Sequence, residues 1–277
     1  MLKEKVHIAV PTAFFEDESL NVHGTIDHIK NLHHQGIKSV LVCGTTGEQH
    51  SLSLEEKTAL LDGLVSEKEL LNEMEVLFGV ASIRQKEAEL LADKISTTNI
   101  SGVMLGYPPY IIPSQEEAVA YSRSIIQRSS KPAILYNNPK RTGFDLSTAS
   151  IVKLSRLDSV IGIKEAGNKE KVTEMKQLIN KQAFYFYIGG EIDAAAKIAS
   201  GFNRLSSMAG NIAPVEFKNW FLKKLADEDL TDQENETIKG VTAEVNEGNP
   251  VVNIKRLLHE EGIDLGTCRS PIGSVHR

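Results

Sequence analysis

The chain has 277 residues, of which 41% are hydrophobic and 25% charged, and its formal net charge is −6. This composition is that of an ordinary globular protein, and the acidic balance gives no support for nucleic-acid binding. The two cysteines, Cys43 and Cys268, are too few for a disulfide framework, and no apolar run approaches membrane-spanning length. We therefore expect a cytoplasmic protein that binds neither nucleic acid nor membrane.

Short apolar runs rich in β-branched residues alternate with amphipathic segments along most of the chain. The predicted strands are Val6–Ala13, Ser39–Gly44, Glu75–Val80, Gly102–Tyr107, Pro132–Asn137, Val160–Lys164, Phe184–Gly189 and Arg204–Ala209. The helices predicted after these strands are Val22–Gln35, Leu54–Ser66, Arg84–Ser96, Gln115–Ser129, Ser147–Leu157, Lys169–Asn180, Glu191–Ser200 and Pro214–Leu225. Ser53 and Ser114 each stand three residues before a glutamate, which is the capping-box pattern of a helix start.

Strand–helix alternation of this kind predicts parallel strands joined by right-handed crossovers. Eight such units at this length favour an α/β fold, a closed (β/α)₈ TIM barrel over residues 1–226. The competing architecture is an open doubly wound sheet, but the first strand ends in Pro11-Thr12-Ala13 and not in a glycine-rich phosphate turn. Residues 227–277 carry two further predicted helices, Asp232–Asn246 and Pro250–Glu261, and we expect a small helical extension beside the barrel.

Active sites of such barrels lie at the C-terminal ends of the strands. The second predicted strand ends in Cys43-Gly44-Thr45-Thr46-Gly47-Glu48, where small residues expose backbone amides and two hydroxyls can donate hydrogen bonds. A small carboxylate fits such a turn. A tight turn without a ligand is the alternative, and the motif matches neither a Walker A loop nor a dinucleotide fingerprint.

The fifth predicted strand ends in Tyr136, and Arg141 follows it closely. A phenol at this place is one barrel position from the next strand end and can exchange protons with a bound substrate. Packing with the hydroxyl bonded to backbone is the alternative for Tyr136. Arg141 can bind a carboxylate with two hydrogen bonds, or it can form a surface ion pair.

The sixth predicted strand contains the most informative residue of the chain, Lys164. The run Val160-Ile161-Gly162-Ile163 before it is typical of a fully buried strand. A lysine ammonium at its end loses hydration, which disfavours the charged form, and a neutral lysine can form a Schiff base with a carbonyl substrate. The alternative is an ordinary lysine whose ammonium lies in water beyond the strand end.

Motifs along nearly the whole chain resemble the dihydrodipicolinate synthase/N-acetylneuraminate lyase family. They are Gly44-Thr45-Thr46-Gly47-Glu48, Pro108-Pro109-Tyr110, Tyr136-Asn137-Asn138-Pro139-Lys140-Arg141-Thr142-Gly143, Ile163-Lys164-Glu165-Ala166, Gly189-Gly190-Glu191, Gly210-Asn211-Ile212-Ala213-Pro214 and Asn249-Pro250-Val251. Their order and spacing match those of the family. The resemblance implies pyruvate-dependent class I aldolase chemistry on a TIM barrel without a metal or other cofactor, in a homotetramer or homodimer.

The resemblance also assigns roles to single residues. It implies that Lys164 forms the Schiff base with pyruvate and that Tyr136 is the acid/base. Thr45 and Thr46 would hold the pyruvate carboxylate, with Thr45 and Tyr110 completing a proton relay in which Tyr110 reaches across a dimer interface. The substrate-binding residues that it implies are Thr45, Thr46, Arg141, Gly189 and Ser206, with Arg141 on the carboxylate of the aldehyde partner.

Some positions depart from the family pattern. The chain has Pro109-Tyr110 where dihydrodipicolinate synthases commonly carry a tyrosine pair, and Pro-Pro-Tyr is similar to sugar-acid dehydratases and aldolases of the family. The positions associated with lysine feedback inhibition do not match inhibited enzymes; they hold Gln49, His50, Lys57 and Pro109. The leading prediction is a lyase that condenses pyruvate with L-aspartate-β-semialdehyde in lysine/diaminopimelate biosynthesis. The alternatives are cleavage or dehydration of 2-keto-3-deoxy sugar acids or N-acetylneuraminate, and a keto-acid sensor.

The first predicted helix carries four histidines, His23, His28, His33 and His34, but no two have the i, i+4 spacing of a zinc motif. We expect no metal site there and interpret the four as part of a solvated helix face. Cys43 is expected to be a small core residue.

Overall fold

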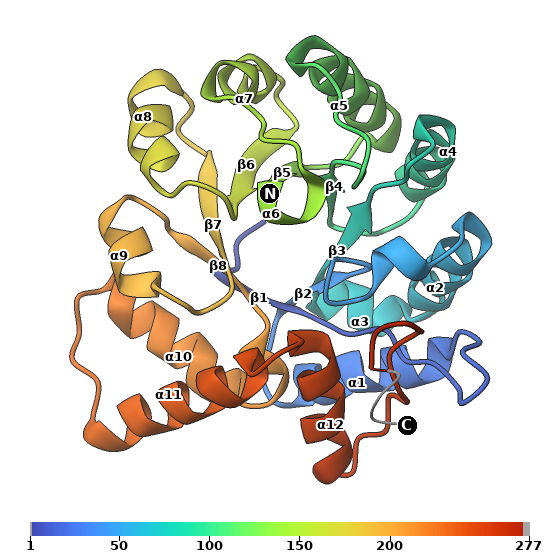
Figure 1. Cartoon of the computed structure of the whole chain (residues 1–277), viewed down its shortest axis with the longest axis vertical. Helices are drawn as coiled ribbons and strands as arrows, with labels where there is room; N and C mark the ends of the chain where they lie inside the picture. Colours follow the sequence, from blue (N-terminus) through green and yellow to red (C-terminus); the bar gives the residue numbers. More distant parts are fainter. Residues whose placement is uncertain (1, 274–277) are drawn as a thin grey trace.

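A computed structural model describes residues 2–273 as a closed barrel of eight parallel strands. Each strand pairs in parallel with the next one along the chain, and β8 pairs with β1 to close the barrel (Figure 1). The strands are β1 (Val6–Ala9), β2 (Ser39–Val42), β3 (Glu75–Val80), β4 (Gly102–Gly106), β5 (Ala133–Asn137), β6 (Val160–Glu165), β7 (Tyr185–Gly189) and β8 (Arg204–Ser207). The predicted TIM barrel is confirmed.

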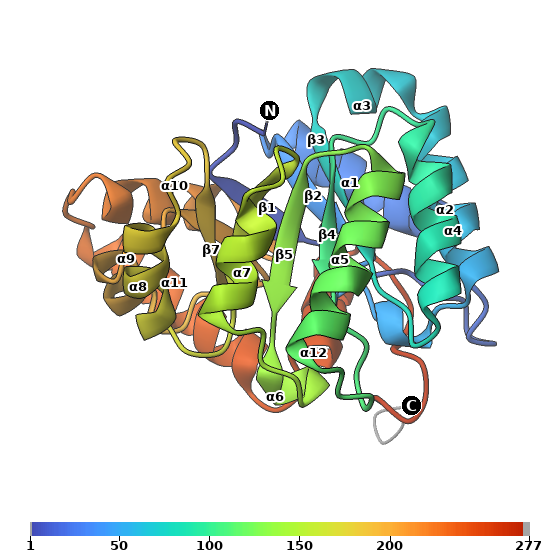
Figure 2. The same ribbon diagram turned by 90° about the horizontal axis from the view of Figure 1, so that it is seen from above.

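Helices surround the barrel on the outside, and the last two lie beside it near α10 and α1 (Figures 1 and 2). The helices are α1 (Val22–His34), α2 (Leu54–Ser66), α3 (Lys68–Glu73), α4 (Gln85–Ser96), α5 (Gln115–Ser129), α6 (Pro139–Thr142), α7 (Thr148–Ser155), α8 (Glu170–Leu178), α9 (Ala194–Ala199), α10 (Pro214–Leu225), α11 (Asp232–Asn246) and α12 (Pro250–Glu260), with 3₁₀ turns η1 (Gln49–Ser51) and η2 (Ala209–Asn211). Both predicted capping boxes, at Ser53 and Ser114, are present. Within residues 2–273 no helix has the length and apolar character needed to cross a membrane.

Two apolar cores explain why the strands are almost continuously hydrophobic. The larger core lies between strands and helices, and a smaller group of buried side chains, which includes Leu41, Leu77, Met104 and Tyr187, forms a second cluster. Leu41 and Leu77 are register partners on neighbouring strands and therefore point to the same face of the sheet. A strand that contributes to both cores carries apolar residues on both faces, as expected for a parallel sheet covered by helices.

Several boundaries differ from the predicted ones for physical reasons. β1 ends at Ala9 and not at Ala13, because Pro11 has no backbone N–H to continue the ladder. α9 begins at Ala194 and not at Glu191, because Asp193 adopts a left-handed conformation with a φ of 57°. The short helices α3 and α6 were not predicted. A helix of one turn, such as α6 with its proline at the first position, is too short to show an amphipathic repeat in the sequence.

The histidines of α1 do not all lie on a solvated face, so that part of the prediction is wrong. His28 is 1% exposed, and its Nε2 lies 2.9 Å from Oδ1 of Asn211 in η2. Burial lowers the pKa of His28, although the contact with Asn211 acts in the opposite direction. His23 and His34 are exposed and His33 is half-buried. His28 is therefore a packing residue between α1 and the end of β8.

A buried ion pair fastens the C-terminal extension to the loop that follows β2. Nζ of Lys255 on α12 lies 3.0 Å from Oε1 of Glu48, and the two side chains are 3% and 1% exposed. Lys255 also donates to the carbonyl of Thr267 at 3.0 Å, and Glu48 Oε2 accepts from the backbone N–H of Arg269 at 3.0 Å. The division of the chain at 226/227 stays a prediction, because α11 packs directly against α10.

We expect Lys255→Met to lower the free energy of unfolding by about 3–5 kcal/mol, because it leaves the Glu48 carboxylate buried without its cation. Urea or thermal unfolding measures the loss. Lys239→Met is the matched control, because the Lys239 side chain is 72% exposed and its Nζ lies 3.4 Å from Oε1 of Glu236. Exposed pairs of this kind contribute about 0–1 kcal/mol. Equal stability of the two variants would contradict a structural role for the buried pair.

Candidate active site

Lys164 lies inside the barrel near the C-terminal end of β6. It is 7% exposed, and its Nζ donates to Oγ of Ser206 on β8 at 2.9 Å. The same Nζ lies 4.7 Å from the centroid of the Tyr136 ring. Gly189 leaves room for this side chain, because a Cβ at that position would lie 3.0 Å from Cε of Lys164. The lysine is therefore held in one place by β5, β7 and β8 together.

The surroundings of Lys164 favour its neutral form. Burial is the largest influence and lowers the pKa of Lys164; the phenolate form of Tyr136 and the carboxylate of Glu191 act to raise it. Arg141 acts with burial, because a second positive charge nearby disfavours the ammonium. The net pKa of Lys164 is below the ordinary lysine value of 10.5. A larger fraction of the amine is consequently available as a nucleophile near neutral pH.

Tyr136 is the register partner of Lys164 on the neighbouring strand, so both side chains point to the inside of the barrel. Its hydroxyl accepts a hydrogen bond from Nδ2 of Asn138 at 2.7 Å and is also hydrogen-bonded to Thr45. Burial alone would raise the pKa of Tyr136, but the charge of Lys164 and these two hydrogen bonds outweigh burial and lower the pKa. A phenol with side-chain partners and a lowered pKa is suited to proton transfer.

The turn after β2 contributes Thr45 and Thr46. The N–H of Glu48 donates to the carbonyl of Thr45 at 3.1 Å, which closes the turn, and Thr12 Oγ1 donates to the Gly47 carbonyl at 2.7 Å. Thr46 is 4% exposed. These bonds fix the two threonines at the strand end, where their hydroxyls and amides can meet an anion.

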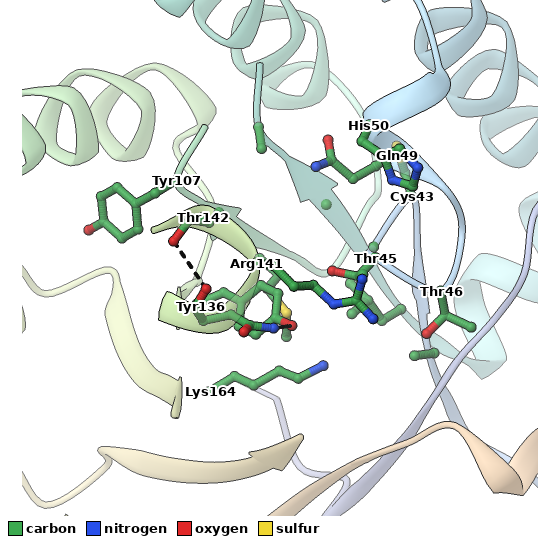
Figure 3. Close-up of a pocket in the computed structure, with 18 of the residues that line it drawn as sticks. Cys43, Thr45, Thr46, Gln49, His50, Tyr107, Tyr136, Arg141, Thr142 and Lys164 are labelled. Atoms are coloured by element: carbon green, nitrogen blue, oxygen red, sulfur yellow. Dashed lines mark hydrogen bonds between the residues drawn. The ribbon is translucent and has the colours of Figure 1, made fainter. Parts of the chain in front are cut away.

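A pocket of about 280 Å³ opens at these strand ends. Figure 3 shows Lys164, Tyr136 and Arg141 extending into it from one side and Thr45 and Thr46 from the other. The remaining lining residues are Ala9, Leu41, Cys43, Gly44, Gln49, His50, Gly79, Val80, Ala81, Met104, Gly106, Tyr107, Pro109, Asn138, Thr142 and Ile272. Cys43 is fully buried, and burial raises the pKa of its thiol to about 12, so it stays protonated at neutral pH.

Most of the predicted site residues lie at this pocket, and one does not. The residues that line it are Lys164, Tyr136, Thr45, Thr46 and Arg141. Ser206 and Gly189, the other two predicted substrate-binding residues, lie beside the Lys164 side chain. The remaining predicted residue, Tyr110, is 93% exposed and absent from the described lining.

Arg141 differs from the buried guanidinium that its predicted role suggests. It lies on the single turn α6 at the pocket mouth and is exposed. Within residues 2–273, no carboxylate is placed in an ion pair with Arg141, and its role stays a prediction. Its positive charge is therefore directed at the pocket and not compensated by a neighbouring acid.

Two residues at the site were quoted in sequence motifs but given no role. One is Asn138, whose side chain donates a hydrogen bond to the Tyr136 hydroxyl. Its position two residues after the tyrosine at the strand end is the sequence feature that could have predicted this contact. The other is Glu191, whose Oε1 accepts from Ser207 Oγ at 2.6 Å and from the backbone N–H of Met208 at 2.9 Å. Burial raises the pKa of Glu191, and its Oε2 has no hydrogen-bond partner in the described part of the chain.

Potential metal ligands do not gather at this pocket. Across residues 2–273, no group of three or more histidine, cysteine, aspartate or glutamate side chains is arranged to hold a metal ion. The groups that converge here are instead an amine, a phenol, hydroxyls and a guanidinium. That set suits a carbonyl compound that carries carboxylates.

Comparisons with known proteins agree with this arrangement. The model of the dihydrodipicolinate synthetase family matches residues 3–277. The 4-hydroxy-tetrahydrodipicolinate synthase of Oceanobacillus iheyensis is 28% identical over 272 residues, which cover 97% of this chain and 90% of that protein. The chloride-inhibited dihydrodipicolinate synthase from Acinetobacter baumannii, complexed with pyruvate, is similar with a TM-score of 0.86 and 26% identity, over 98% of this chain and 93% of the other.

A 2-keto-3-deoxygluconate aldolase variant from Sulfolobus solfataricus is also similar, with a TM-score of 0.80 and 23% identity over 97% of this chain and 89% of the other. At that identity the likeness extends to the fold alone. The family match, in contrast, spans nearly the whole chain and includes every motif quoted above, so the resemblance is confirmed. The chain belongs to the dihydrodipicolinate synthetase family, whose members are pyruvate-dependent class I lyases and aldolases.

Proposed function

We propose that the chain is a 4-hydroxy-tetrahydrodipicolinate synthase, which condenses pyruvate with L-aspartate-β-semialdehyde through a Schiff base on Lys164. The product would enter lysine and diaminopimelate biosynthesis. The name of the Oceanobacillus iheyensis relative and the pyruvate in the Acinetobacter baumannii complex support this choice of substrates. The observation that carries the proposal is the buried amine of Lys164, which lies 4.7 Å from the ring of a tyrosine hydrogen-bonded to Thr45.

The reaction follows from the chemistry of a neutral amine beside a phenol. The Lys164 nitrogen attacks C2 of pyruvate, and the carbinolamine loses water to give a protonated imine. Tyr136 delivers the proton to the departing hydroxyl and later accepts one from the pyruvate methyl group, which leaves an enamine. The enamine carbon attacks the aldehyde, whose oxygen takes up the proton held by Tyr136. The amino group of the semialdehyde then adds to the imine carbon and displaces the Lys164 amine, which closes the ring of the product and frees the lysine. The imine nitrogen accepts the electron pair, so the proposal requires no metal or other cofactor.

Two carboxylates would be held by two different parts of the pocket. The Thr45–Thr46 turn lies at the end of a strand that belongs to the barrel wall, and we assign it to the carboxylate of pyruvate. Arg141 lies on α6 at the mouth and would bind the carboxylate that the semialdehyde carries beyond its reacting carbon. Ser206 would face the bound intermediate, because its hydroxyl accepts from Nζ of Lys164, and Gly189 would leave room for it, because a Cβ there would lie 3.0 Å from Cε of Lys164.

We also propose that Tyr110 is covered by a second copy of the chain. Tyr110 has a positive φ of 74°, and the neighbouring Ile111 and Ile112 are 47% and 67% exposed. Three adjacent exposed apolar side chains favour burial in an oligomer. A homodimer or homotetramer of this kind would bring Tyr110 to the relay that also contains Thr45 and Tyr136.

A sugar-acid aldolase is the second candidate, and one observation favours it. Gln49 and His50 line the pocket beside Thr46. His50 is exposed at the pocket rim, and its partial burial lowers the pKa of the imidazole, which favours the neutral ring at pH 7; the nearby charge of Glu48 partly opposes this. Neutral donors and acceptors suit the hydroxyl groups of a polyhydroxy aldehyde. The same Schiff base would serve both reactions.

A substrate panel distinguishes the two candidates. We expect turnover with pyruvate and L-aspartate-β-semialdehyde, measured by loss of both substrates, to exceed cleavage of 2-keto-3-deoxygluconate and of N-acetylneuraminate by at least about a hundredfold in kcat/KM. A site built to hydrogen-bond a substrate group typically rejects an analogue that lacks it by about 10⁴–10⁵-fold, so a hundredfold margin is a lower bound. Brisk cleavage of a keto-deoxy sugar acid without reaction of the semialdehyde would reject the leading proposal and support the second.

Tyr136→Phe tests the acid/base assignment. The change removes one hydroxyl and little volume, so the fold and the binding of the pyruvate carboxylate should survive, whereas borohydride trapping of Lys164 should slow, because Tyr136 also serves the step that forms the imine. We expect kcat to fall by about 10²–10⁴-fold, which is the usual contribution of a positioned acid/base group. Tyr107→Phe is the control, because the Tyr107 hydroxyl is hydrogen-bonded to Ser122 at 2.8 Å and is not assigned to the reaction. A similar loss in both variants would assign the effect of Tyr136→Phe to packing.

Arg141→Ala tests the choice of second substrate. We expect the KM for the semialdehyde to rise at least about tenfold, since a hydrogen bond to a charged group is typically worth about 1.5–3 kcal/mol. The KM for pyruvate should change much less, because its carboxylate is assigned to Thr45 and Thr46. Arg141→Lys keeps the charge but loses the forked geometry and should lie between wild type and Arg141→Ala. Equal damage to both KM values would make Arg141 a structural residue.

A further inference from the structure

The end of the described chain reaches the active-site pocket. Ile272 lines the pocket together with Thr46, Gln49 and His50, although more than two hundred residues separate it from them in the sequence. Figure 2 shows the described C-terminal segment at the same side of the barrel as α6, the side toward which β5 points. The side of the pocket formed by Thr46, Gln49 and His50 is therefore completed by the C-terminal segment.

Several contacts hold the C-terminal segment in this position. The Arg269 guanidinium donates to the Ser51 carbonyl at 2.7 Å and to the Glu18 carbonyl at 2.9 Å, and it forms a two-pronged ion pair with Glu56. Arg269 also lies over the Phe14 ring, 4.3 Å from its centroid. Glu56 raises the pKa of Arg269, so the guanidinium stays charged at every accessible pH. The clamp, Arg269 with Glu56, therefore fixes the segment three residues before Ile272.

The clamp and the buried Lys255–Glu48 pair act on one loop. Glu48 lies two residues after Thr46, and its carboxylate contacts both the Lys255 ammonium and the backbone N–H of Arg269. The loop that carries the anion-binding threonines and His50 is thus tied to the C-terminal segment through Glu48, and the helix α2 that follows the loop is tied to it through Glu56. The position of Ile272 is consequently as well defined as that of the loop.

Ile272 meets the pocket where the outer part of a substrate would lie. Lys164 and Tyr136 come from the strands at the base, whereas Ile272 belongs to a segment beyond the strand ends. Pyruvate bound to Lys164 occupies the base. What extends toward Ile272 is the chain of the aldehyde beyond its reacting carbon, and a half-buried branched side chain limits its length.

We propose that Ile272 is a specificity-determining residue that limits the length of the aldehyde acceptor, and that Arg269 is the positioning residue that holds it there. This inference rests on the proposed Schiff-base function. It assigns the C-terminal extension a part in substrate selection, with no part in the reaction at Lys164.

The test compares Ile272→Ala and Ile272→Phe with wild type. The aldehydes are the one that wild type turns over and its homologue longer by one methylene group. We expect Ile272→Ala to raise the relative kcat/KM for the longer aldehyde about tenfold, the usual effect of one methylene group, and Ile272→Phe to lower it. The KM for pyruvate and borohydride trapping of Lys164 should stay within about twofold, as for most substitutions away from the reacting groups. Leu178→Ala is the matched control, because Leu178 is 53% exposed at the end of α8 and outside the described pocket lining.

Normal trapping of pyruvate with an unchanged preference between the two aldehydes in both Ile272 variants would overturn this inference alone. The same shift in Leu178→Ala would also overturn it. Failure of wild type to trap pyruvate would overturn the proposed function, and this inference with it.

Discussion

The burial of one ammonium group, that of Lys164, is the constraint on which the site depends. Removing the group from water disfavours its charge, and the contacts that replace water are a serine hydroxyl and a tyrosine ring. Glu191 raises the pKa of Lys164 and Arg141 lowers it, and the net pKa lies below the ordinary value. A barrel strand buried at every position can hold a lysine in this way, whereas a solvated loop would leave the amine charged.

The residues proposed for the reaction and those proposed to select the second substrate lie in different parts of the barrel. Its strands supply the base of the pocket, with Lys164 and Tyr136 in register on neighbouring strands. Loops and the C-terminal segment supply the rim, with Arg141, His50 and Ile272. In the proposed function the base forms the pyruvate imine, in keeping with the pyruvate-dependent class I chemistry of the family. The rim can vary without disturbing the base, so one fold can serve both a semialdehyde and a sugar-derived aldehyde.

Sequence reasoning identified the parts of the site that local patterns encode. Lys164 and Tyr136 follow clear strand signals, and the rule that strand ends converge in a barrel places them together. The contact of Ser206 with Lys164 depends on the register of two strands, which periodicity does not specify. His28 is polar and was therefore assigned to the solvated face, but it stands four residues before the buried Leu32, and a turn distant in sequence contacts it. Ile272 follows a segment in which hydrophobic residues repeat with neither helical nor strand periodicity, so the sequence pattern does not predict that it lies at the pocket.

The most direct test of the central claim is the pH dependence of imine formation with pyruvate. Protein and pyruvate are mixed at a series of pH values and quenched with borohydride, and the labelled peptide is identified by mass spectrometry. We expect one reduced pyruvyl group per chain, on Lys164, at a rate that rises with pH as the amine loses its proton. The midpoint of that rise should lie below the ordinary lysine value of 10.5. A label on another lysine, or a midpoint at or above 10.5, would contradict the account.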